Sequence, residues 1–321
     1  MITNNRGVPL ALAVWAVHDD YDYMTDDNYI SVTGLMKPLR QIILGSRVKP
    51  GEKTPLDVQD LIASAFGTAM HDSVEKAWLN YKRNMPKLGF PASVIDKIRI
   101  NPSPAEAAEP GIIPIYMEVR TKKAVMEYTV GGKFDMIADG LLQDNKSTTV
   151  YTWIYGGKDE DYKLQGSLYR WLNPDKVKED YIQINFIFTD WSKTEARRDP
   201  NYPQSRLLEK KIPLMSIEET QKWVEWKLGQ IRKYWNAPDE QIPECTDEEL
   251  WRTDPKFKYY TDPSKTSGRA YRSYDTMAEA QAFMNERGKG GVIITIEGQV
   301  KRCGYCAAFP TCKQKDKYTH D

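Results

Sequence analysis

Cysteine is scarce in this sequence: four cysteines occur in 321 residues, and none lies before Cys245. A chain so poor in cysteine lacks the dense disulfide framework of small secreted folds. Long apolar runs are also missing, because no stretch approaches the roughly 18 consecutive apolar residues that a membrane-spanning helix needs. We therefore expect an intracellular protein with no membrane partner.

An excess of positive charge is absent as well, since Lys and Arg together number 45 and Asp and Glu together number 45. This balance excludes a generally basic coat for nucleic acid but is compatible with a local basic channel. The sequence also lacks a phosphate-binding P-loop, a G-x-S-x-G elbow and a dinucleotide fingerprint placed after a strand. Enzymes of those chemistries therefore have little support.

The clearest secondary-structure signal is a long amphipathic helix. Thr54 is a suitable N-cap and Pro55 suits the first helical position, and apolar residues then recur at spacings of three and four between positions 61 and 81. The pattern predicts a helix buried along one side. It would carry Gly67 and His71 one turn apart.

The remaining elements follow from shorter patterns. The apolar segment 9–17 is interpreted as an early strand, and a change in character near residue 237 indicates a domain boundary between 1–236 and 237–321. Ser216 and Glu219 have capping-box spacing for one helix, and Thr276 and Glu279 for another. The other expected elements are strands near 115–120, 124–130, 181–189 and 256–261 and a helix over 159–172.

The segment GGKFDMIADGLLQDNKSTT, residues 131–149, reads as a hairpin with unusual charges. Asp144 and Lys146 share a face because strand side chains alternate. Across a turn at 138–140, the incoming strand can bring Asp135 beside them. Two carboxylates so close favour a cation between them, and oxygen ligands suit Mg²⁺ or Mn²⁺. The lysine would orient or deprotonate a water bound to that metal.

The D-x-K triplet alone does not establish a metal site. A charged hairpin edge also explains it, because charge protects exposed strands from pairing. Similar triplets occur elsewhere in the chain, at 209–211, 225–227 and 254–256. The interpretation therefore depends on the neighbouring motifs.

Four motifs stand in order along the chain: GTAMH at 67–71, GKFD at 132–135, DNK at 144–146 and QGSLY at 165–169. In this ordered set the chain resembles the PD-(D/E)XK nuclease superfamily, and within it the RecB-type branch that includes CRISPR-adaptation and phage exonucleases. The resemblance covers about residues 28–190 and, separately, the C-terminal cysteines.

The resemblance implies an α/β fold with a central mixed β-sheet flanked by helices, the nuclease core, over residues 1–236. A small C-terminal α+β module with cysteines would follow over 237–321. It further implies a deoxyribonuclease, a metal-dependent DNA exonuclease that hydrolyses phosphodiester bonds in phage or bacterial DNA recombination, replication or repair. Mg²⁺ or Mn²⁺ would be the cofactor.

Carried over by position, the resemblance implies a catalytic role for Lys146 and a steadying role for Gln165 and Tyr169, toward the site or the DNA backbone. The metal ligands would be the side chains of His71, Asp135 and Asp144 and the backbone carbonyl of Asn145. Asp144 stands where many members have glutamate, which leaves metal number and preference open.

The same residues have simpler interpretations. His71 borders an apolar helix stripe and could be a hydrogen-bonded core histidine. Gln165 and Tyr169 could form the polar rim of an amphipathic helix, and Gly67 could let a neighbour pack closely. Glu75, one turn after His71, is a candidate for a further ligand or an outer partner of the metal.

The C-terminal segment RCGYCAAFPTCKQ spaces Cys303, Cys306 and Cys312 as C-x2-C-x5-C, and Cys245 is the remaining cysteine. Clustered thiols in an intracellular protein favour a metal or a cluster over disulfides. The resemblance implies a four-iron, four-sulfur (4Fe-4S) cluster, although in several members the fourth cysteine precedes the core. Zinc is the alternative, with Cys245 or His320 as fourth ligand.

Basic side chains gather in clusters that could neutralise phosphates or could simply be solvated surface. They are Arg40, Arg47, Lys82, Arg83, Arg197 and Arg198. No sequence-reading element is evident, so we expect DNA binding with little specificity, alongside a helicase, an annealing protein or a single-strand binding protein. The rival hypothesis is a non-catalytic module for binding DNA or a partner, built on a degenerate nuclease fold with a zinc staple.

Overall fold

The computed structural model describes residues 2–318. Contacts between Cα atoms divide the chain into two compact units, Met1–Lys37 with Pro55–Gln230 and Pro38–Thr54 with Ile231–Asp321. The second unit therefore includes helix α3 (Leu39–Arg47) from the N-terminal part of the chain. The division at residue 237 remains a prediction, and each unit is described by itself below.

The first unit is built on a six-stranded sheet of order β11-β10-β9-β8-β5-β4. The pairs β9–β10 and β4–β5 are parallel, whereas β8–β9, β5–β8 and β10–β11 are antiparallel. The strands are β4 (Ile98–Ile100), β5 (Ile113–Met117), β8 (Met136–Ala138), β9 (Leu141–Thr148), β10 (Tyr181–Phe188) and β11 (Leu207–Pro213).

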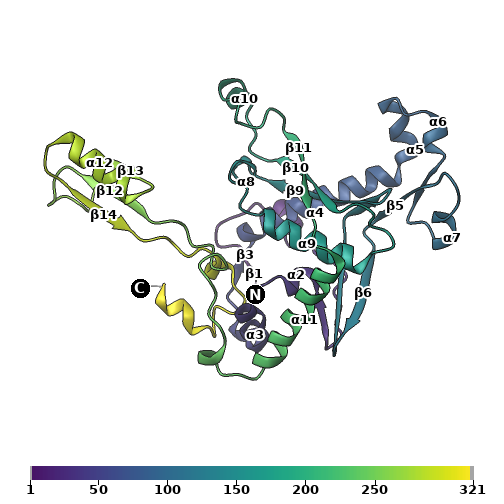
Figure 1. Cartoon of the computed structure of the whole chain (residues 1–321), viewed down its shortest axis with the longest axis horizontal. Helices are drawn as coiled ribbons and strands as arrows, with labels where there is room; N and C mark the ends of the chain where they lie inside the picture. Colours follow the sequence, from purple (N-terminus) through teal and green to yellow (C-terminus); the bar gives the residue numbers. More distant parts are fainter. Residues whose placement is uncertain (1, 319–321) are drawn as a thin grey trace. The chain divides into compact units, whose positions relative to one another are not determined.

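Helices flank this sheet (Figure 1). Helix α4 (Val58–Leu79) packs against β9, and α9 (Asp159–Leu172) packs against β10 and β11. The prediction of an α/β fold with a central mixed sheet flanked by helices is thus confirmed. The other helices of this unit are α1 (Leu10–Ala16), α2 (Val32–Leu35), α5 (Tyr81–Asn84), α6 (Ala92–Ile95), α7 (Pro104–Ala107), α8 (Val150–Tyr155), α10 (Lys193–Arg198) and most of α11 (Ile217–Tyr234).

Two smaller sheets complete the first unit. Strand β7 (Tyr128–Lys133) pairs in parallel with β2 (Tyr29–Ser31) and antiparallel with β6 (Arg120–Val125). Strands β1 (Ile2–Thr3) and β3 (Leu56–Asp57) form a short parallel pair. Strand β7 ends two residues before Asp135, so it helps to place that carboxylate.

Strand β10 shows why the sequence pattern predicts the sheet well. Its burial alternates along the strand, and the buried set is Ile182, Ile184, Phe186 and Phe188. Ile184 lies beside Asp144 of β9 in the parallel register. Asp144 is therefore buried beside the apolar face of β10.

The strand expected near 124–130 is instead interrupted by the turn between β6 and β7. Two further local predictions were wrong. Helix α4 begins after Asp57, not Thr54, because Asp57 accepts a hydrogen bond from the backbone of Gln59 in a capping box. The segment 9–17 is helical over Leu10–Ala16, not a strand, because Ala13 and Ala16, three residues apart, pack together in the core cluster that includes Val58 of α4.

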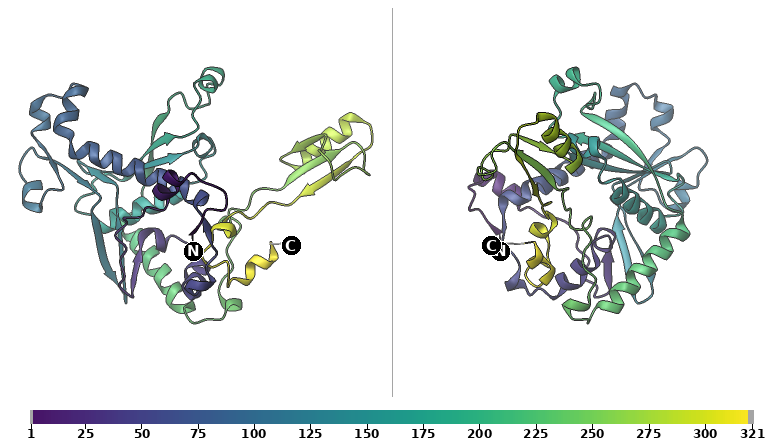
Figure 2. Two further views of the ribbon diagram at one scale, coloured as in Figure 1. Left: turned by 180° about the vertical axis from the view of Figure 1, so that it is seen from behind. Right: turned by 60° about the vertical axis from the view of Figure 1, so that its left-hand side comes forward.

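The second unit contains a three-stranded antiparallel sheet of order β13-β12-β14. Its strands are β12 (Lys256–Tyr260), β13 (Arg272–Tyr274) and β14 (Val292–Ile296). Helix α12 (Met277–Arg287) packs on β12 and β13 (Figure 2) and begins at the predicted capping box of Thr276 and Glu279. Short 3-10 helices, Arg302–Tyr305 and Lys313–Lys317, follow the sheet. Among the described residues, no helix has the length and apolar character needed to cross a membrane.

Candidate metal and thiolate sites

The hairpin β8–β9 sets the geometry of the predicted metal site. Asp139 and Gly140 form its turn with φ values of 49° and 88°, as their turn-forming character predicts. The register pairs Met136 with Gln143, so its extension sets Asp135 opposite Asp144. Asp135 Oδ2 accepts a hydrogen bond of 2.9 Å from the backbone N–H of Asn145. The carboxylate of Asp135 is therefore fixed against strand β9.

His71 reaches the same carboxylate from helix α4. Its Nδ1 lies 3.2 Å from Asp135 Oδ2. The hydrogen bond to Asp135 raises the pKa of His71, against the opposing effect of burial. His71 of the first motif is thus in contact with Asp135 of the second motif.

Glu118 lies beside His71 and Asp135 as a third candidate metal ligand. It was not identified from the sequence. Ligand atoms of His71, Glu118 and Asp135 all lie within 4.8 Å of one another. Glu118 directly follows β5, and its backbone N–H donates to the carbonyl of Asp135. The sequence does show a single acidic residue, Glu118, directly after the apolar strand 113–117. Its position beside His71 and Asp135, however, depends on the pairing of β5 with β8, which the sequence does not reveal.

The backbone of Glu118 adopts φ = 52°, in the left-handed region that a residue with a long side chain rarely occupies. Its carboxylate forms an ion pair of 2.8 Å with Lys133. Burial raises the pKa of Glu118, and the ion pair opposes that rise. The strained backbone holds a carboxylate beside His71 and Asp135, which is a common use of such conformations at functional sites.

Asp144 and Lys146 form the other half of the site on strand β9. Asp144 is only 2% exposed, and its Oδ2 lies 2.6 Å from Lys146 Nζ. Gln165 of helix α9 donates a long hydrogen bond of 3.4 Å to Asp144 Oδ1. The alternation along β9 therefore sets both charged side chains on one face, and the third and fourth motifs meet there. Among the described residues, Asp144 falls outside the close group of His71, Glu118 and Asp135.

Burial dominates the electrostatics of this pair. It raises the pKa of Asp144 to about 6, although the charge of Lys146 opposes the rise. Burial alone would lower the pKa of Lys146, but the adjacent Asp144 carboxylate outweighs it and raises that pKa. A buried carboxylate of this kind is favourable as an ion only with a cation nearby.

Tyr169 contributes to packing and to a hydrogen bond with the backbone. Its hydroxyl donates to the backbone carbonyl of Lys133 at 3.0 Å, and its ring is buried. A Cβ at Gly132 would lie 2.8 Å from Tyr169 Cε1 and 2.9 Å from a methyl group of Val32. Gly132 is therefore required for close packing, whereas a Cβ at Gly67 would meet Ser147 Oγ at an ordinary 3.7 Å.

These donors are of the kind that hold metal ions in proteins. The ligand atoms of one imidazole and two carboxylates lie within 4.8 Å of one another, and a further buried carboxylate stands on the next strand. Glu75 lines the same small pocket as His71, Glu118 and Asn145. It is not part of the close group among the described residues.

The four cysteines of the second unit line one small, mainly apolar cavity. Cys245, Cys303, Cys306 and Cys312 all carry free thiols there. Burial raises the pKa of Cys245 to about 12, and neighbouring Cys312 and Cys306 act in the same direction. Cysteine thiolates bind metals, so this cavity is a second candidate metal site. His320 lies outside the described residues.

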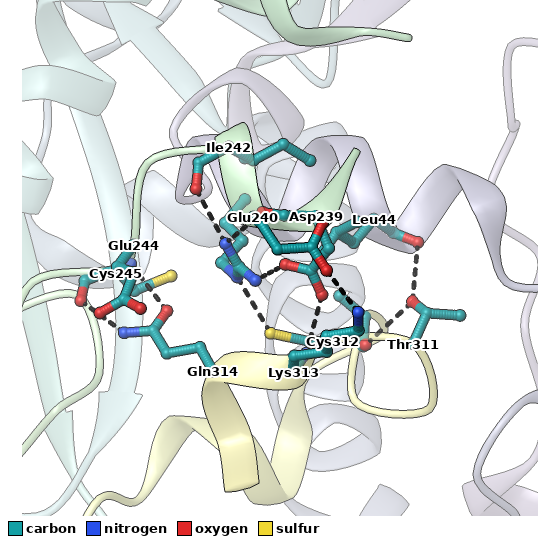
Figure 3. Close-up of polar contacts among 12 residues, drawn as sticks. Leu44, Asp239, Glu240, Ile242, Glu244, Cys245, Thr311, Cys312, Lys313 and Gln314 are labelled. Carbon is teal, nitrogen blue, oxygen red and sulfur yellow. Dashed lines mark hydrogen bonds and ion pairs between the residues drawn. The ribbon is translucent and has the colours of Figure 1, made fainter. Parts of the chain in front are cut away.

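Gln314 explains how the distant Cys245 joins the other cysteines. Its side-chain amide accepts from the backbone N–H of Cys245 at 2.8 Å and donates to its carbonyl at 2.9 Å. Gln314 is buried, so these two hydrogen bonds are protected from solvent. Figure 3 shows this pair beside the network around Cys312.

The predicted DNA contacts occupy different environments. Lys82 and Arg83 are exposed on α5 and line an open groove with Arg99, while Arg197 and Arg198 are exposed on α10. Arg47 is half-buried and donates to the backbone carbonyl of Trp235. Arg40 is 4% exposed and contacts the cysteine cavity, so its guanidinium has no free face for a phosphate.

Comparisons with known proteins give only remote similarity. No family model matches the chain, and no curated protein does. The solved structure of SSO0001 superposes with a TM-score of 0.41 at 14% identity, covering 72% of this chain and 91% of its own. A phage-related exonuclease from Haemophilus somnus 129PT gives a TM-score of 0.29 at 16% identity, with 64% and 93% coverage. Scores this low carry no argument about function.

Proposed function

We propose that the first unit is a metal-dependent DNA exonuclease of the RecB type, which hydrolyses phosphodiester bonds. The observation that carries the proposal is the convergence of the four motifs on one hairpin. His71 and Asp135 are in contact, Asp135 is bonded to β9, and Asp144 is in contact with Lys146 and Gln165. The most distant of these pairs, His71 and Asp135, is 64 positions apart in the sequence.

The cation would be held by His71, Asp135, Asp144 and the carbonyl of Asn145, and we add Glu118 to this set. A bound Mg²⁺ or Mn²⁺ would lower the pKa of a coordinated water and neutralise charge on a scissile phosphate. Lys146 holds a proton beside Asp144, where it can donate a hydrogen bond to a phosphate oxygen or to the attacking water. Gln165 orients the Asp144 carboxylate.

DNA would be bound through exposed basic side chains of the first unit, Lys82, Arg83, Arg197 and Arg198. Such contacts with phosphates are independent of sequence and weaken as salt rises. The cysteines of the second unit would hold a four-iron, four-sulfur cluster or, failing that, zinc. Either group would crosslink the segments that carry the cysteines.

The test is digestion of linear and covalently closed circular DNA by the purified full chain. We expect nucleotide release from linear single-stranded or double-stranded DNA with Mg²⁺ or Mn²⁺, none with EDTA, and far less from closed circles. Cleavage that persists in EDTA contradicts the metal dependence. Tight DNA binding without any cleavage would favour the rival, a non-catalytic binding module.

A further inference from the structure

Helix α3 directs one charged side chain, Arg40, into the interior of the second unit. Arg40 Nε lies 3.1 Å from Cys312 Sγ, and Nη1 donates to the carbonyls of Ile242 at 2.9 Å and Asp239 at 3.2 Å. Nη2 forms an ion pair with the carboxylate of Asp239. Figure 3 shows Asp239, Ile242 and Cys312, the partners of this guanidinium, converging from two distant segments.

A guanidinium is always charged, so its burial needs compensation. Asp239 neutralises the charge, and the two carbonyls satisfy Nη1. The Nε donor is directed at sulfur. A thiol is a weak acceptor, whereas a thiolate is a strong one for a charged donor. Cysteine binds metals as the thiolate, so in a metal-loaded site the contact between Arg40 Nε and Cys312 Sγ would be a charged hydrogen bond.

We propose that Arg40 is a positioning residue of the thiolate site: it donates a charged hydrogen bond to the Cys312 thiolate and offsets the negative charge of the group that the cysteines bind. Hydrogen bonds to sulfur and net charge set the reduction potential of iron–sulfur clusters, and outer partners of metal ligands stabilise binding. The inference rests on the thiolate site of the proposed function and is independent of the nuclease reaction.

Arg47 provides a matched control on the same helix. It is a second arginine of α3, and its guanidinium donates to the backbone carbonyls of Trp235 and Tyr234. It does not line the cysteine cavity among the described residues. Replacing it removes the same charge from the same helix but leaves the sulfur contact intact.

The experiment uses the full-length protein reconstituted with ferrous iron and sulfide under argon and, in parallel, with zinc. Wild type, Arg40→Gln, Arg40→Lys and Arg47→Gln are compared for the rate of metal loss to a chelator and, when iron is bound, for the midpoint potential. We expect Arg40→Gln to lose the metal about tenfold or more faster and to have a lower potential. Arg40→Lys should recover part of both effects, and Arg47→Gln should match wild type.

Asp239→Asn separates the sulfur contact from the ion pair. It removes the counter-charge of Arg40 but retains the donor to Cys312, so the potential should rise, opposite to the effect of Arg40→Gln. A merely structural ion pair would shift both variants in the same direction, and that result overturns the inference. Equal loss rates and potentials in wild type and Arg40→Gln also overturn it.

If Arg40→Gln fails to fold, by circular dichroism, Asp239→Asn decides alone, and an unchanged or lowered potential counts against the inference. Should wild type bind zinc and no iron, the loss rates decide. Wild type that takes up neither iron nor zinc overturns both the inference and the proposed thiolate site, whereas loss of DNA cleavage alone concerns the nuclease proposal. The failures of the two proposals are thereby distinguishable.

Discussion

Glu118 and Glu75 are the two glutamates that compete for a role beside His71. Both line the same pocket, but only Glu118 has an oxygen within 4.8 Å of the ligand atoms of His71 and Asp135 among the described residues. We expect Glu118→Gln to weaken Mn²⁺ binding on the order of tenfold or more, because loss of even an outer partner costs that much. Glu75→Gln should change it little.

Calorimetric titration of each variant with Mn²⁺ measures this difference. Equal affinity in wild type and Glu118→Gln would remove Glu118 from the ligand set. A larger loss in Glu75→Gln than in Glu118→Gln would reverse the assignment and favour the residue that the sequence alone suggests.

Competition between protons and the metal ion gives a second prediction, which concerns Asp144 and His71. The pKa of Asp144 is raised to about 6 by burial, and that of His71 is raised by Asp135. Both groups therefore keep their protons at higher pH than usual, and a cation must displace them. Mn²⁺ affinity should rise as pH increases from about 5.5 to about 7.5. A dissociation constant that is independent of pH over this range contradicts the prediction.

At the scale of elements, the close approach of β7 to α2 and α9 depends on Gly132. A Cβ there would meet Tyr169 and Val32 at less than 3.0 Å, so Gly132→Ala should destabilise the fold by about 1–3 kcal/mol through overpacking. Gly67→Ala is the matched control inside helix α4. Its Cβ meets Ser147 at an ordinary distance, and alanine favours the helix by about 0.5–1 kcal/mol.

Urea unfolding followed by circular dichroism compares the two variants. A Gly132→Ala protein as stable as wild type would show that α9 has room to move. A strongly destabilised Gly67→Ala protein would show that the first motif needs glycine for packing after all.

Periodicity predicted the elements that one residue pattern determines. The alternation of β10, the capping boxes at Ser216 and Thr276, and the end of α9 at Asn173 are all as expected. The start of α4 was missed because Leu56 and Asp57 pair with β1, a contact distant in sequence. Segment 9–17 was misread because apolar residues at most positions fit a strand or a helix equally well.

The candidate site likewise contains residues that a local pattern places and residues that only distant contacts place. The hairpin, Asp144 and Lys146 could be placed from the sequence because alternation along one strand fixes their common face. Glu118 and the burial of Arg40 could not, because both depend on pairings between distant segments. The position of α3 with the C-terminal segment is likewise a consequence of contacts more than 190 positions apart.

For the whole molecule, the account predicts that metal at the cysteines stabilises one unit selectively. Binding to the folded form alone adds to its stability. Removal of that metal by a strong chelator should speed hydrogen exchange in peptides of 38–54 and 231–318. Peptides of β9 and β10 should exchange at an unchanged rate. Uniform loss of protection across both units, measured by mass spectrometry, would contradict this selectivity.

The most direct test of the central claim is the rate at which the full chain releases nucleotides from end-labelled linear DNA with Mn²⁺. This rate is compared among wild type, Asp144→Asn, Lys146→Gln and Asp254→Asn. Asp254 belongs to the exposed D-x-K triplet at 254–256, outside the proposed site. We predict loss of cleavage by at least about a hundredfold in Asp144→Asn and Lys146→Gln, and wild-type cleavage by Asp254→Asn. Undiminished cleavage by Asp144→Asn and Lys146→Gln would contradict the account.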